Sequence, residues 1–184
     1  NTSYQMNTRL VGSEKCKRDR PNTIKPIFLY YVPNSNHFQR NENGDYAVPH
    51  SIAGVEIKGK SQYTDGSKGG EREDMVLEND VAFGALLQSL RDIDDPRSPG
   101  DKLIDNTLII FTSDNGPNVG DNLGINQESG GLRGKKAKLW EGGHRVPFLL
   151  YWKGHFDKKR LNRNLFSLVD LFSTCLLYTS DAAD

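Results

Sequence analysis

Two short apolar runs on either side of one long helical pattern constrain the fold of this chain more than any other feature. The first run, residues 26–32, reads "PIFLYYV", and the second, residues 106–112, reads "NTLIIFT". Short runs that are apolar on both faces are typical of strands that are covered on both sides. We therefore expect two buried strands, with a helix between them in the sequence.

The helical pattern covers residues 71–92. Its acidic first turns complement the helix dipole, and Glu71, Asp74 and Asp80 are predicted to form a solvated face. The apolar side chains near the opposite face are Val76, Phe83, Leu86, Leu87 and Leu90. A strand, a helix and a strand in this order predict a largely parallel sheet with right-handed crossovers, which is an α/β fold.

The rest of the chain adds fewer regular elements. A third strand is predicted within residues 146–152, and a helix is predicted to open within residues 164–172. Residues 33–70 form a long polar stretch with many Gly and Pro residues, which predicts a functional loop.

The charge balance excludes several classes of partner. Lys plus Arg and Asp plus Glu both number 24, so the formal net charge is +0. A chain without net charge has no global field to attract nucleic acid or an acidic membrane, so neither partner is expected. No apolar stretch approaches the roughly 18 residues of a transmembrane helix. Any site for an anion must therefore be local.

The second apolar run ends in an acid and an amide. Asp114 and Asn115 follow it closely, and ligands of parallel α/β sheets gather at the carboxyl ends of strands. Their oxygens suit Ca²⁺ or Mg²⁺, and Gly116 is predicted to let the backbone turn sharply behind them. Two ligands do not complete a metal site, and an ordinary Asx turn is the simpler interpretation of these residues alone.

A glycine-rich basic loop, residues 130–147, follows the strand. Its Arg and Lys side chains suit an oxyanion. It is not a Walker A loop, because Ser129 stands where that motif requires glycine. A solvated basic loop is the alternative; a nucleic-acid patch is disfavoured by the zero net charge and the lack of interleaved aromatic residues.

Together these segments resemble the sulfatase family of the alkaline-phosphatase-like superfamily, and within it bacterial arylsulfatase A-type proteins. The family pattern "TDNG" is matched by "SDNG" at 113–116, and "LRGGKxxxxEGGxRVP" by "LRGKKAKLWEGGHRVP" at 132–147. The family strand "PFFLYxxxxxxH" is matched by "PIFLYYVPNSNH" at 26–37. The resemblance covers about residues 24–174. It implies an incomplete alkaline-phosphatase-like α/β/α sandwich with a largely parallel sheet.

The resemblance also implies roles for individual residues. By this resemblance, Asp114 and Asn115 are expected to be ligands of a divalent cation, usually Ca²⁺. Lys136 is expected to be the cation that holds the sulfate, and His37 is expected to donate a hydrogen bond to the leaving oxygen. Fixed cations and donors stabilise the charge that develops during ester cleavage. Lys135 stands where glycine is commoner, so which of the two lysines contacts sulfate stays open.

The family's nucleophile is not recognisable in this chain. Sulfatases use a Cys or Ser of a "CxPxR" motif that is oxidised to formylglycine. The segment "CKRDR" at 16–20 has Arg18 in place of the proline and lies just before the histidine strand, so we do not expect it to be catalytic. The paired aspartates that complete the family's metal site are missing too. The chain alone is therefore expected to be inactive.

The parent protein is expected to hydrolyse a sulfate ester on an aryl group or a sulfated glycan. One alternative is a phosphoryl or phosphonate hydrolase of the same superfamily. Another is a fragment that binds a metal or an anion without catalysis. Many bacterial relatives are exported, so the resemblance implies a periplasmic or secreted protein.

The last ten residues, "CLLYTSDAAD", match the in-frame translation of a sequencing-library transposon adapter. The predicted division is therefore a partial sulfatase catalytic domain at residues 1–174 and a non-native tail at residues 175–184.

Overall fold

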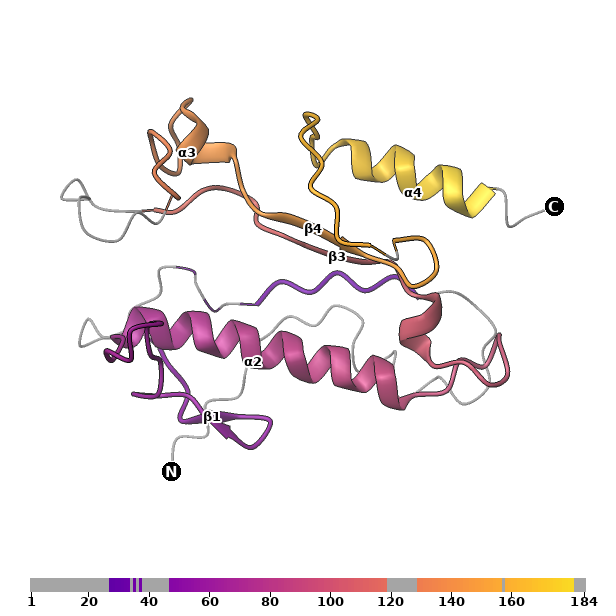
Figure 1. Ribbon diagram of the computed structural model, residues 1–184, viewed down its shortest axis with the longest axis horizontal. Coiled ribbons are helices and arrows are strands. Elements are labelled where there is room, and N and C mark those ends of the chain that lie inside the picture. The colour runs from indigo at the N-terminus through magenta and orange to yellow at the C-terminus, as the bar shows by residue number, and fades with distance from the viewer. Residues whose placement is uncertain are drawn as a thin grey trace.

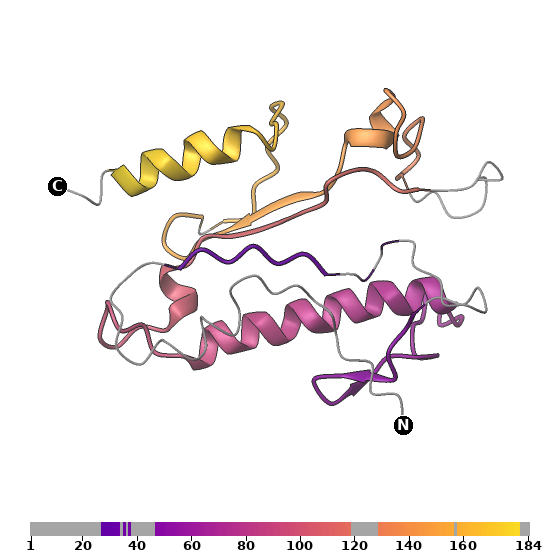
Figure 2. The same ribbon diagram turned by 180° about the vertical axis from the view of Figure 1, so that it is seen from behind.

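The computed structural model describes residues 27–33, 35, 37, 47–118, 129–156 and 158–180. The elements in chain order are β1 (Ser51–Ile52), β2 (Val55–Glu56), α2 (Glu71–Asp92), η1 (Leu103–Asn106), β3 (Ile109–Thr112), α3 (Glu141–His144), β4 (Phe148–Tyr151) and α4 (Asp170–Ser180). In both views β3 and β4 lie between α2 on one side and α4 on the other (Figures 1 and 2). The described part of the chain is thus layered as helix, strands and helix.

Helix α2 has the predicted bounds and covers β3. The Glu73 carboxylate accepts a hydrogen bond from the Gly70 N–H at 2.7 Å, which satisfies a backbone donor at the helix start. The helix ends at Asp92 because Ile93 takes an extended conformation. The ring of Phe83 packs on Phe111 of β3, with centroids 5.3 Å apart. This aromatic contact joins the helix layer to the strands.

The prediction of a solvated acidic face on α2 is wrong for Asp74, which is only 2% exposed. Its carboxylate accepts hydrogen bonds from the Gly59 N–H at 2.6 Å and from the Ser61 hydroxyl and N–H at 2.6 and 3.0 Å. The predicted apolar face is wrong at Val76, which is 55% exposed, whereas Met75 is buried. The loop after β2 packs on the first turn of α2, and helical periodicity carries no information about such a contact.

The sheet differs from the predicted one. β3 pairs with β4 antiparallel, with Ile109 opposite Tyr151 and Thr112 opposite Phe148, and β1 and β2 form a second antiparallel pair. The described residues contain no parallel strand pair, so the largely parallel sheet is not confirmed. Among the described residues between β3 and β4 the single-turn helix α3 is the only regular element, and the chain enters β4 in the direction opposite to that of β3.

Residues 27–33 are extended but belong to no assigned strand. In Figures 1 and 2 this segment runs between α2 and the β3–β4 pair, in the same direction as β3. Tyr31 of this segment is half-buried, and burial together with the charge of Glu78 on α2 raises the pKa of its phenol. The predicted cover on both faces is wrong in the described structure, because Phe28 and Tyr30 are 83% and 70% exposed. Side chains alternate along an extended chain, so only one face is covered.

The other predicted elements are present with shifted bounds. β4 lies inside the strand predicted at 146–152. The helix predicted to open within 164–172 is α4, which begins at Asp170 and continues across position 174. The predicted division of the chain at 174 stays a prediction. None of the described helices has both the length and the apolar character needed to cross a membrane.

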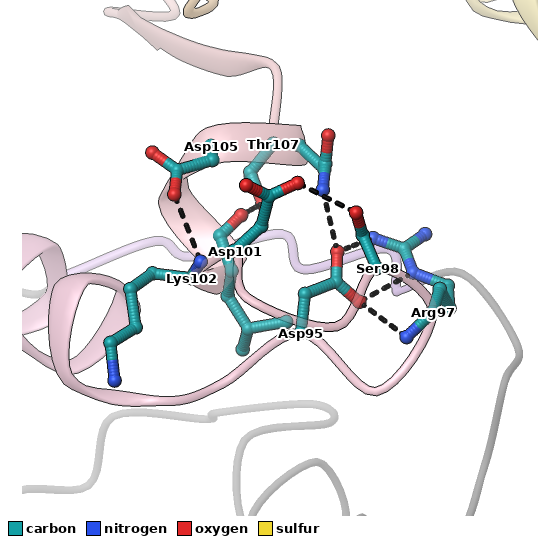
Figure 3. A network of polar contacts seen from close by, with 9 residues as sticks. Asp95, Arg97, Ser98, Asp101, Lys102, Asp105 and Thr107 are labelled. Carbon is teal, nitrogen blue, oxygen red and sulfur yellow. Dashed lines mark hydrogen bonds and ion pairs between the residues drawn. The ribbon is translucent and has the colours of Figure 1, made fainter.

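An ion pair between the buried Asp95 and the exposed Arg97 organises the turn between α2 and η1 (Figure 3). The Arg97 guanidinium donates from Nε and Nη2 to the two Asp95 oxygens at 3.0 and 2.9 Å, and Asn106 donates at 3.0 Å. These bonds, led by those of Arg97, hold the pKa of Asp95 well below its usual range although burial opposes the charge. The turn connects the end of α2 to the approach to β3 and thereby directs the strand that carries the candidate site.

One strained turn gives a stability prediction. Ala53 and Gly54 connect β1 and β2 with positive φ angles of 49° and 81°, a backbone that favours glycine and asparagine over alanine. Ala53→Asn should therefore raise the free energy of unfolding by about 0.5–1 kcal/mol, as measured by urea denaturation. Ala47→Asn is the matched control, because Ala47 is exposed and lacks a positive φ. An equal effect at both positions would contradict the prediction.

Candidate functional site at the end of strand β3

The candidate site begins where β3 ends. Asp114 is exposed and Asn115 is half-buried, one and two residues beyond Ser113 at the strand end. The Asn115 amide nitrogen donates to the Gly116 carbonyl at 2.9 Å, and the Ser113 hydroxyl lies 3.5 Å from an Asp114 oxygen. No ion pair joins Asp114 to another described residue. Its carboxylate is therefore not neutralised by a cation of the described chain.

The donor set at this strand end suits a hard divalent cation. A carboxylate and an amide oxygen on adjacent residues are ligand types of Ca²⁺ and Mg²⁺, which take about six to eight oxygens in total. Among the described residues, no group of three or more His, Cys, Asp or Glu is placed to hold a metal. Asp114 and Asn115 therefore fit the chemistry of a cation but supply only part of its shell.

The basic loop docks on the strand end through its backbone. The Lys136 N–H donates to the Pro117 carbonyl at 2.9 Å, and the Gly116 N–H donates to the Gly143 carbonyl at 2.9 Å. These two bonds join residues 113–118 to the basic loop. The structure thus brings Asp114, Asn115 and Lys136, which the sequence placed in two separate motifs, to one end of β3.

Glycines permit this close approach. A Cβ at Gly116 would overlap the Gly142 carbonyl oxygen, and a Cβ at Gly142 would overlap the Gly134 carbonyl oxygen. Neither Gly116 nor Gly142 has a positive φ. The backbone does bend at residues 114–116, as predicted, but without a positive φ at Gly116 the bend does not by itself require glycine. Gly116 is required because two backbones touch there, and no local pattern in the sequence reports such a contact.

An aromatic contact holds the basic loop in shape. The Arg133 guanidinium lies 3.6 Å from the centre of the Trp140 ring, a cation–π contact. At the end of the loop, Arg145 donates to the Glu141 carboxylate at 2.7 Å. The contact between Arg133 and Trp140 was missed, because the six loop residues between the partners show no periodicity.

The remaining predicted residues are less well connected. Lys135 and Lys136 are both half-buried, so burial does not distinguish them. His37 is exposed, and no hydrogen bond joins its imidazole to a described residue. The segment 27–33 that precedes it runs toward the end of the molecule that carries α3 (Figures 1 and 2). The role of His37 stays a prediction, and the "CKRDR" segment lies outside the described residues.

The layers of helix and strand, with a polar site beyond the end of a strand, place this chain among α/β proteins. The family model described as Sulfatase matches residues 17–181, and the chain belongs to the sulfatase family. No solved structure matches the chain significantly.

Relatives of known function have similar sequences. The chain is 31% identical over 158 residues to the N-acetylgalactosamine-6-O-sulfatase of Bacteroides thetaiotaomicron. It is 30% identical over 155 residues to human N-acetylgalactosamine-6-sulfatase and 31% identical over 150 residues to human arylsulfatase A. Each alignment covers 82% of this chain but only 26%, 24% and 24% of the respective relative. The chain thus spans about a quarter of the length of these relatives.

Proposed function

We propose that the whole protein containing this chain hydrolyses sulfate esters at the end of β3. The observation that carries this proposal is the docking of the basic loop beside Asp114 and Asn115. The docking includes the hydrogen bond from the Lys136 N–H to the Pro117 carbonyl at 2.9 Å. The names of the relatives support a sulfated glycan or an aryl sulfate as the substrate class.

The chemistry of a sulfate ester explains the residue types. The substrate is an anion, so Lys136 would hold the sulfate and balance its charge. Asp114 and Asn115 would hold Ca²⁺ or Mg²⁺, which would add positive charge beside the sulfate when bound. His37 would donate to the leaving oxygen, a role that suits an imidazole near neutral pH. The nucleophile, a formylglycine, would come from a part of the protein outside this chain.

The two adjacent lysines give a sharp test of the sulfate contact. In a complete protein, Lys136→Ala should lower kcat/KM for an aryl sulfate by about 100-fold or more, because it removes a fixed cation at the developing charge. Lys135→Ala is the matched control and should lower kcat/KM by less than about tenfold. The reverse order would assign the sulfate contact to Lys135. Faster turnover of the matching aryl phosphate would support a phosphoryl hydrolase instead.

A second test addresses the cation. Asp114→Ala should weaken Ca²⁺ binding about tenfold or more and lower activity at limiting Ca²⁺, because it removes a charged ligand. Isothermal titration calorimetry measures the binding. Asp80→Ala is the control, because it removes an exposed carboxylate from α2. It should leave both Ca²⁺ binding and activity unchanged. If Asp114→Ala had the same calcium dependence as the wild type, the ligand assignment would be refuted.

A further inference from the structure

The connection between β4 and α4 carries a basic strip, which we define as Lys158, Lys159, Arg160 and Arg163. These four cations lie within six residues, and all of them are exposed. The strip belongs to no helix or strand. In Figures 1 and 2 the connection lies on the side of the β3–β4 pair that carries α4, away from α2.

The charge of the strip is not balanced within the described chain. None of its four residues forms an ion pair with another described residue. The nearby Lys153 differs, because its ammonium lies 2.6 Å from Asp105. Since the formal net charge of the whole chain is +0, the strip is a local concentration of positive charge. Such a concentration attracts a polyanion at short range even where no global field exists.

We propose that the basic strip binds a sulfated polysaccharide, a proposal that rests on the proposed function. Cations on successive residues of an irregular, exposed segment can meet several sulfates of one polymer at once, and these contacts add. Arginine also binds oxyanions through paired N–H donors, and both Arg160 and Arg163 are available for such contacts. The strip would hold the polymer on the enzyme while one of its sulfate esters is hydrolysed at β3.

Other polyanionic partners fit the strip less well. Residues 158–165 contain no aromatic side chain, so they lack the stacking surface that binds unpaired nucleic-acid bases. The segment is not helical, so it has no apolar helix face to enter a lipid surface, although Leu161 and Leu165 are exposed. Binding of single-stranded nucleic acid and binding of a lipid surface are therefore the alternative outcomes of the test.

The test compares two variants of the 184-residue chain with the same loss of charge. The first is K158Q/K159Q/R160Q, and the control is K58Q/K60Q/K68Q, which changes exposed lysines of another loop. Binding of a fluorescent chondroitin sulfate oligosaccharide is measured by anisotropy over a series of salt concentrations. The strip variant should bind on the order of 100-fold more weakly at low salt, with a salt slope smaller by about two to three. The control should change by less than about threefold.

Three results would overturn the proposal. The first is that both variants bind the oligosaccharide equally more weakly than the unmutated chain. The second is that chemical desulfation of the oligosaccharide leaves its binding unchanged. The third is that single-stranded DNA or phosphatidylserine vesicles bind more tightly than the oligosaccharide at the same salt concentration. Hydrolysis of a small aryl sulfate by the whole protein separates this proposal from the proposed function. That activity should be equal in both variants, because neither set of substitutions changes a residue of the site proposed at the end of β3. Its absence from the unmutated protein would refute the proposed function and leave the binding result intact.

Discussion

Replacing Asp74 with alanine should lower the free energy of unfolding by about 3–4 kcal/mol, because it leaves several buried donors without their acceptor. The carboxylate is 2% exposed and accepts the Gly59 N–H, the Ser61 N–H and the Ser61 hydroxyl. These bonds attach the loop after β2 to the first turn of α2. Urea denaturation followed by helix circular dichroism measures the loss.

The same carboxylate makes stability depend on pH. Burial, the largest single influence, raises the pKa of Asp74, but the hydrogen bonds from Ser61 and Gly59 together outweigh it and the pKa is lowered. A lowered pKa in the folded state stabilises the fold above the unfolded pKa, about 3.9 for aspartate, and this stability is lost as pH falls through the folded value. Wild-type stability should therefore fall below about pH 4, and less steeply in Asp74→Ala.

Asp80→Ala is the control for this prediction, because Asp80 lies on the same helix but is exposed. It should change the free energy of unfolding by no more than about 0.5 kcal/mol and leave the acid dependence as it is in the wild type. If the Asp74 and Asp80 variants lost stability equally, or if Asp74→Ala kept the full acid dependence, the structural role of Asp74 would be refuted.

Gly116→Ala should have the second-largest effect, a loss of about 2–3 kcal/mol, because a Cβ there would overlap the Gly142 carbonyl oxygen. Alanine tolerates the backbone angles at this position, since φ is not positive, so the loss reports the contact alone. The basic loop should then separate from the end of β3. Trypsin cleavage after Lys135 and Lys136 should become faster, and in the whole protein hydrolysis of an aryl sulfate should fall.

Gly84→Ala is the control, and its expected effect has the opposite sign. Gly84 lies within α2, and a Cβ there would meet no atom within 4 Å. Alanine should therefore stabilise the helix by about 0.8–1 kcal/mol. If Gly116→Ala were neutral while Gly84→Ala stabilised the chain, the loop would not depend on the close contact, and the geometric argument for the Lys136 site would lose its support.

Local patterns in the sequence were sufficient for much of the fold. The predicted helix and α2 both cover Glu71–Asp92, and β3 and β4 lie within predicted strands. Helical periodicity and short apolar runs depend on neighbouring residues, which is why they can be read without a structure. The motifs at 113–116 and 132–147 also predicted the family that the match over residues 17–181 confirms.

Contacts between distant segments could not be read in this way. The sequence did not reveal that Asp74 is buried under the loop after β2, or that Arg133 lies on Trp140. It also placed β3 in a parallel sheet, whereas its described partner β4 is antiparallel. Each of these features depends on where the chain returns after a loop, and loop paths leave no periodic trace in the sequence.

The sequence by itself determined the long helix, two of the strands, the sulfatase family and the residues proposed for the site. Only the tertiary structure decided that Lys136 reaches the end of β3 and that Gly116 is required for this approach, since a Cβ there would overlap the Gly142 carbonyl oxygen. The physical reason is the range of the interactions. Propensity and motif spacing act along the chain, whereas a backbone contact between two loops exists only after the chain has folded.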